Sequence, residues 1–158
     1  MYKYKIDHER GIALSEQKSE IEAVITPLGY LYGRDAIYVD KLYYGLGRRR
    51  VTLAGEFNGA LASKSESDDF VMYTLRFEGV FYFNMVELDL YSDQLPPGQS
   101  DIKSNWLEYR QSPLLERAQQ KQELKELRHF ILFTYDDVFE IACQRYELEL
   151  HPNKSNAE

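Results

Sequence analysis

The chain is short of cysteine and of long apolar runs, and each shortage excludes a class of protein. The single cysteine, Cys143, cannot form an internal disulfide, which fits a reducing compartment. No apolar stretch approaches the roughly 18 residues of a membrane-spanning helix, and the charged N-terminus over Met1–His8 lacks the apolar core of a signal peptide. We therefore expect a cytoplasmic protein with no membrane partner.

Metal ligands and catalytic signatures are missing as well. The three histidines, His8, His129 and His151, show no helical i, i+3 or i+4 pairing, and Cys143 has no partner in a CxxC motif, so no metal site is predicted. Cys143 and His129 are the one conceivable Cys/His pair, but a hairpin over 129–148 would place them at opposite ends, too far for proton transfer. We predict a buried structural cysteine, no catalytic residue and no cofactor.

Negative charge predominates and is unevenly distributed. The formal net charge is −7. Residues 1–60 carry 9 Lys/Arg against 8 Asp/Glu, a charge of +1, whereas residues 61–150 carry 9 against 17, a charge of −8. An acidic surface repels phosphate backbones, so nucleic acid is a disfavoured partner and a basic protein a favoured one.

Length and pattern predict one α+β domain over residues 1–150, built on an antiparallel sheet of meanders and hairpins, with a disordered tail over 151–158. A helix is predicted over 15–26, where Ser15 is the expected N-cap. A polar helix is predicted near 113–128 after the Ser112-Pro113 cap.

Strand patterns are clearest in the middle of the chain. Residues 51–57 alternate between apolar and polar, which indicates a half-buried strand, and Asn58-Gly59 indicates a turn. A second alternating run starts at Val71 and switches phase at Gly79. A two-residue turn at Glu78-Gly79 explains the switch by a hairpin that pairs Phe77 with Val80, and a bulge at Gly79 in one long strand is the alternative.

The C-terminal part begins with a strand of buried type over 129–135. Residues 138–147 fit either a helix or the second strand of a hairpin. We favour the hairpin, because aromatic and β-branched residues are frequent there. In that arrangement Phe139, Ile141 and Cys143 share one face.

Two sets of charged residues are candidate binding sites. Arg48, Arg49 and Arg50 follow two glycines and form a candidate anion-binding site, although the dinucleotide fingerprint requires glycine at position 50. The acids of the second set alternate with apolar residues along two predicted strands. We expect them on the exposed face of a shared sheet, where they would bind the basic partner: Glu87, Asp89, Glu147 and Glu149.

Three segments, taken in order, resemble small bacterial proteins of the polymorphic-toxin immunity type. The first is Phe77-Glu78-Gly79-Val80 continuing to Leu90, the second is Trp106-Leu107-Glu108-Tyr109, and the third runs from His129-Phe130-Ile131-Leu132 to Tyr135-Asp136-Asp137-Val138-Phe139-Glu140-Ile141-Ala142. The resemblance covers about the last half of the chain. It implies a non-enzymatic binding protein that neutralises a toxin, and it assigns no functional residue.

Three hypotheses of function follow. The leading one is a protein-binding module of immunity type that occludes a basic toxin. The second is a small-ligand-binding or enzymatic domain with a pocket near the tyrosines, of which the chain has 13, and Arg48–Arg50. The third is a structural or oligomeric protein that pairs through exposed sheet edges.

Overall fold

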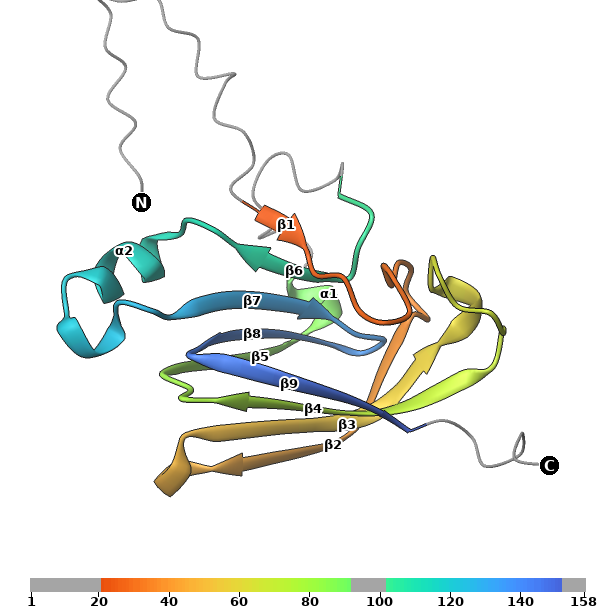
Figure 1. Cartoon of the computed structure of the whole chain (residues 1–158), viewed down its shortest axis with the longest axis horizontal. Coiled ribbons are helices and arrows are strands. Elements are labelled where there is room, and N and C mark those ends of the chain that lie inside the picture. Colours follow the sequence, from red (N-terminus) through yellow and green to blue (C-terminus); the bar gives the residue numbers. More distant parts are fainter. Residues whose placement is uncertain (1–20, 92–101, 152–158) are drawn as a thin grey trace, which may run out of the picture.

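Antiparallel strands in two sheets make up most of the structure, a computed structural model that describes residues 21–91 and 102–151. The sheets lie face to face (Figure 1). The four-stranded sheet has the order β2-β3-β4-β9 and the five-stranded sheet the order β1-β6-β7-β8-β5. The strands are β1 (Ile21–Ala23), β2 (Ile37–Gly45), β3 (Arg50–Asn58), β4 (Phe70–Glu78), β5 (Tyr82–Glu87), β6 (Trp106–Tyr109), β7 (Arg128–Phe133), β8 (Asp137–Cys143) and β9 (Arg145–His151).

The core lies between the two sheets because the strands present alternate residues inward. In the four-stranded sheet Leu53 of β3 pairs with Leu75 of β4, which pairs in turn with Leu148 of β9. From the five-stranded sheet, Trp106 and Phe130 belong to the same buried cluster. The half-buried strand predicted over 51–57 is confirmed by β3, whose residues alternate between buried and partly buried.

The outer face of the five-stranded sheet is also covered. Ile131, Leu107 and Val138 form a second buried cluster with Tyr91, which ends the short helix α1 (Leu88–Tyr91). Helix α2 (Pro113–Gln119) has Ser112 as its N-cap, as predicted, with the Ser112 hydroxyl accepting from the Leu115 amide. No helix in the two described segments is long and apolar enough to cross a membrane.

The phase switch at Gly79 marks a crossing between the sheets, and the predicted hairpin and bulge are both wrong. Strand β4 pairs with β3 and β9, whereas β5 pairs with β8 in the other sheet. Gly79 has the positive φ of +62° expected for a turn. At this turn the chain leaves the four-stranded sheet, so Phe77 does not pair with Val80 but with Val51 and Tyr146.

The predicted hairpin at the C-terminal end is confirmed as far as Cys143, whereas residues 145–147 of the predicted second strand belong to β9 in the four-stranded sheet. Strand β7 pairs with β8, and Phe139, Ile141 and Cys143 all belong to the core between the sheets. The register places His129 opposite Ala142 and Cys143 opposite Arg128, so the prediction that His129 and Cys143 lie at opposite ends is wrong. They lie at the same end, and sheet alternation puts their side chains on opposite faces.

Both predicted helices need correction. Residues 15–20 lie outside the described part of the chain, but Ile21–Ala23 form strand β1, where the sequence predicted the second half of a helix. Pairing with β6 provides hydrogen-bond partners for the backbone of this segment, and this pairing outweighs the helical spacing of its apolar residues. The second helix starts where predicted but ends at Gln119, followed by a short 3-10 turn over Gln122–Leu124. His151, predicted in the tail, is the last residue of β9.

Candidate functional site

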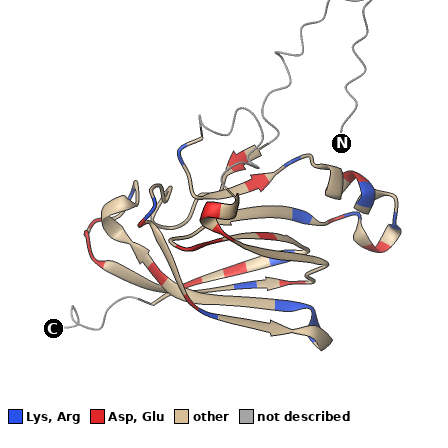
Figure 2. Ribbon diagram, turned by 180° about the vertical axis from the view of Figure 1, so that it is seen from behind, with Lys and Arg blue, Asp and Glu red and all other residues tan. Residues whose placement is uncertain are grey.

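Three turns meet at one end of the two sheets and bring four arginines together. The β2–β3 turn supplies Arg48, Arg49 and Arg50, and the turn between β8 and β9 supplies Arg145. The third turn joins β4 to β5 at Gly79. With Glu78, Phe81 and Gln144 these residues line a hollow of about 340 Å³, which we call the arginine hollow. The basic segments at the tip of the β2–β3 hairpin are visible in Figure 2.

Backbone hydrogen bonds fix the three turns to one another. The amide of Val80 donates to the carbonyl of Arg49 at 2.8 Å, and the amide of Gln144 donates to the carbonyl of Glu78 at 3.0 Å. Gln144 is the point where the chain returns from the five-stranded to the four-stranded sheet. Both crossings between the sheets are therefore next to each other, and the hairpin tip is attached to them.

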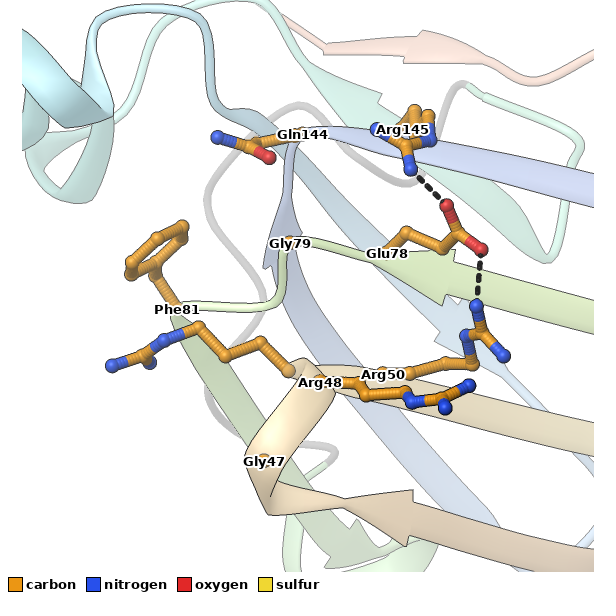
Figure 3. A pocket seen from close by; sticks show the side chains of 9 residues that line it. Gly47, Arg48, Arg50, Glu78, Gly79, Phe81, Gln144 and Arg145 are labelled. Carbon is orange, nitrogen blue, oxygen red and sulfur yellow. Dashed lines mark hydrogen bonds and ion pairs between the residues drawn. The ribbon is translucent and has the colours of Figure 1, made fainter.

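Glu78 lies between two of the arginines (Figure 3). Its carboxylate accepts from Arg50 at 2.9 Å and forms a second ion pair with Arg145. The hydrogen bond from Arg145, together with the charges of Arg145 and Arg50, lowers the pKa of Glu78 below its ordinary value. The carboxylate therefore stays ionised in the neutral range and orients both guanidinium groups.

The other two arginines are arranged differently. The guanidinium of Arg49 lies 4.5 Å from the centre of the Phe81 ring, a cation–π contact. Neither Arg48 nor Arg49 forms an ion pair through its guanidinium with any described residue. The three arginines predicted as an anion site thus lie together, and sequence reasoning missed Arg145 and Glu78, which reach the hollow through the pairing of β4 with β9.

A second feature, which we call the open edge, begins at the hollow. Strand β2 is the last strand of one sheet and β5 the last strand of the other. The ring centres of Tyr44 and Phe83 lie 5.7 Å apart, so the two end strands lie on the same side of the structure. Large apolar side chains remain exposed along or just beyond these strands: Leu42, Tyr43, Tyr44, Leu46, Phe81, Tyr82 and Met85.

The open edge is interrupted by a bulge in β2 between Val39 and Lys41. The carbonyl of Tyr38 is turned inward there and accepts a hydrogen bond from the hydroxyl of Tyr73 at 2.8 Å. Gly55 lies beneath this carbonyl, and a Cβ at Gly55 would overlap it. Bulges and lysines limit unwanted strand pairing at sheet edges, so the part of β2 free to pair is the segment after Lys41.

The four candidate acids do not share a sheet, which contradicts the predicted acidic face. Glu147 and Glu149 are exposed on β9 of the four-stranded sheet, where Glu149 lies 3.6 Å from Arg76. Glu87 ends β5 in the five-stranded sheet and its carboxylate accepts from the amide of Asp89. Alternation places acids on the solvent side of a strand, but it does not show which sheet the strand joins.

One polar cluster on the outer face of the five-stranded sheet was not predicted. The Ser112 hydroxyl lies 2.8 Å from Nδ1 of His129, and Nε2 of His129 lies 2.6 Å from a carboxylate oxygen of Glu140. The residue types are those of the hydrolase triad, but the ring nitrogens are reversed: in hydrolases the serine contacts Nε2 and the carboxylate contacts Nδ1. In addition, Ser112 is only 5% exposed and its hydroxyl caps α2, so the cluster attaches the helix to the sheet.

Among the residues of the two described segments, no group of three or more His, Cys, Asp or Glu side chains is arranged to hold a metal ion. Burial raises the pKa of the Cys143 thiol to about 12, so at neutral pH it is not the thiolate that nucleophilic catalysis requires. No family model, curated protein or solved structure matches this chain. The likeness to immunity-type proteins therefore stays a hypothesis.

Proposed function

We propose that this protein is a non-enzymatic protein-binding module whose partner docks along the open edge. The observation that carries the proposal is the apolar surface of two neighbouring end strands. Tyr43 is 60% exposed on β2 and Met85 is 49% exposed on β5. Tyrosine and methionine are both enriched in protein interfaces, and tyrosine offers a large contact area with a polar tip.

The backbone of β2 offers a second means of binding. A terminal strand presents N–H and C=O groups that a partner strand can pair with, and such pairing provides affinity while side-chain pockets provide specificity. After the bulge, the segment from Leu42 to Gly45 is available for this pairing. Leu42 and Tyr44 pair with the inward-facing Leu53 and Val51 of β3, so they extend the core toward a docked strand.

An immunity protein that neutralises a toxin is the specific form of this proposal, as the resemblance of the C-terminal half implies. Blocking a toxin needs a tight interface and no chemistry. The arginine hollow, lined by glycines, arginines, Glu78, Phe81 and Gln144, contains no serine, cysteine or histidine. Binding is therefore a better use of this site than nucleophilic catalysis.

Affinity capture with matched variants tests the proposal. A Tyr43→Ser/Met85→Ser bait removes two exposed side chains of the open edge. Met72→Ser is the control, because Met72 is 53% exposed on β4, away from the two end strands. A protein captured from source cells would be identified, purified and titrated against all three baits.

The expected result is at least a tenfold loss of affinity for the double variant, since interface anchors of this kind each contribute more than about 1 kcal/mol. The Met72→Ser control should bind like the wild type. Equal binding by the double variant, with its fold intact by circular dichroism, would rule out the open edge as the docking surface.

A further inference from the structure

The arginine hollow contains far more positive than negative charge. Four arginines and a single glutamate, Glu78, are among the residues that line it, which gives the lining a net charge of +3. The protein as a whole has a net charge of −7. Like charges held close together repel one another, so an uncompensated cluster favours binding of an anion.

Glu78 shows how the hollow accommodates a carboxylate. It accepts from Arg50 and Arg145 on its two sides, while its side chain is 21% exposed. Arginine binds carboxylates in a fixed, often bidentate geometry. Arg48 and Arg49 offer two further guanidinium groups whose ion-pairing positions are not used by any described residue.

The backbone at Arg49 is held in an unfavourable conformation. Its φ is +47°, and among the described residues it is the one non-glycine with positive φ. A side chain in the left-handed region costs about 1 kcal/mol or more, and glycine avoids this cost. Strain of this kind often accompanies a functional site. The guanidinium carried by this strained backbone lies against the Phe81 ring at the edge of the hollow.

The hollow and the open edge are continuous. Strand β2 ends at Gly45, and the turn over Leu46–Arg48 leads directly to Arg49. A strand paired with the segment from Leu42 to Gly45 and continued past its end would therefore reach the arginines. We propose that the partner docks through an extended acidic segment, whose backbone pairs with β2 and whose carboxylates bind Arg48 and Arg49. This inference rests on the proposed protein-binding function and reverses the charge predicted for the partner.

Fluorescent peptides of defined charge test the inference. Three peptides of equal length alternate threonine with glutamate, glutamine or lysine, and their affinities for the full chain are measured by fluorescence anisotropy. The hollow is altered by Arg48→Gln/Arg49→Gln. The matched control, Arg76→Gln/Arg110→Gln, removes the same charge from residues that do not line the hollow.

The glutamate peptide should bind at least tenfold more tightly than the glutamine peptide, because charge-assisted hydrogen bonds are about twice as strong as neutral ones. Arg48→Gln/Arg49→Gln should remove this preference, and the control should retain it. Rising ionic strength should weaken binding of the glutamate peptide and leave the affinity of the glutamine peptide unchanged.

Three results would overturn the inference. Equal affinity for glutamate and glutamine peptides, both lost in Tyr43→Ser/Met85→Ser, would leave the open edge as a docking site without acid recognition. If the hollow variant and its control lost the preference for the glutamate peptide equally, that preference would be due to the net charge of the protein rather than to the hollow. The labelled glutamate peptide can also be displaced by inorganic phosphate or by unlabelled glutamate peptide. If phosphate displaces it at the lower concentration, the hollow is a site for a phosphate ligand.

Discussion

Gly55 lies beneath the bulge of β2, and its replacement by alanine tests how the open edge is built. A Cβ at this position would overlap the carbonyl oxygen of Tyr38 and lie 2.8 Å from the carbonyl carbon and 3.0 Å from Cα of Val39. All three atoms belong to the backbone, so no side chain can rotate to make room. Strand β2 must therefore move away from β3 in the Gly55→Ala variant.

The size of the effect follows from two costs. Forcing an extra methyl group into a packed site costs about 1–3 kcal/mol. Moving Tyr38 also breaks the hydrogen bond from the Tyr73 hydroxyl, 2.8 Å long, and a buried donor without a partner costs about 1–3 kcal/mol. We expect a loss of about 2–6 kcal/mol from a total stability of about 5–15 kcal/mol.

Urea unfolding followed by circular dichroism measures this loss as a lower transition midpoint. Gly47→Ala is the control, because a Cβ at Gly47 meets no atom within 4 Å, and it should change stability by less than about 0.5 kcal/mol. A Gly55→Ala protein that is within about 1 kcal/mol of the wild type would refute the close approach of Tyr38 to Gly55, and with it the bulge as described.

Three further variants test other parts of the structure. Gly79→Val should lower stability by more than about 1 kcal/mol in thermal melts, since φ is +62° and the Gln144 side chain occupies the space; a normal melting temperature would contradict the turn. Cys143→Ser should cost about 1–2 kcal/mol without affecting partner binding, and native Cys143 should alkylate slowly, because burial raises its pKa to about 12; fast alkylation would contradict its burial. Because ion pairing lowers the pKa of Glu78, its stabilisation is present above the unfolded-state pKa and is lost as pH falls through the folded-state pKa. Glu78→Gln should therefore lose less stability than the wild type on acidification, and parallel pH profiles would contradict the pairing.

Local pattern predicted much of the strand content and little of the strand partnership. The alternation in β3 and the hairpin of β7 with β8 were predicted, because each depends on neighbouring residues. At Gly79 the same phase switch fits a turn, a bulge or a crossing to a second sheet. Periodicity shows which face of a strand is buried, but it does not show which strand lies beside it.

The candidate site follows the same division. Arg48–Arg50 are consecutive, so their clustering was readable from the sequence. Glu78 and Arg145 meet through the register of β4 with β9, which is a long-range pairing. The acids Glu87 and Asp89 were assigned to the same face as those of β9 because their alternation is alike, yet β5 belongs to the other sheet and Asp89 lies in helix α1.

The two points where the chain crosses between the sheets determine where the arginine hollow lies and hold its backbone in place. The chain passes from the four-stranded to the five-stranded sheet at Gly79 and returns at Gln144, and a hydrogen bond joins these two points. The tip of the β2–β3 hairpin would otherwise be attached by its own strands alone, but the amide of Val80 binds the carbonyl of Arg49. The guanidinium groups are therefore carried by backbone that both sheets hold in place. A ligand that binds ordered groups has less conformational entropy to remove, so under the proposed docking the hollow at the end of the open edge is where a partner's charge would be bound with the least reorganisation.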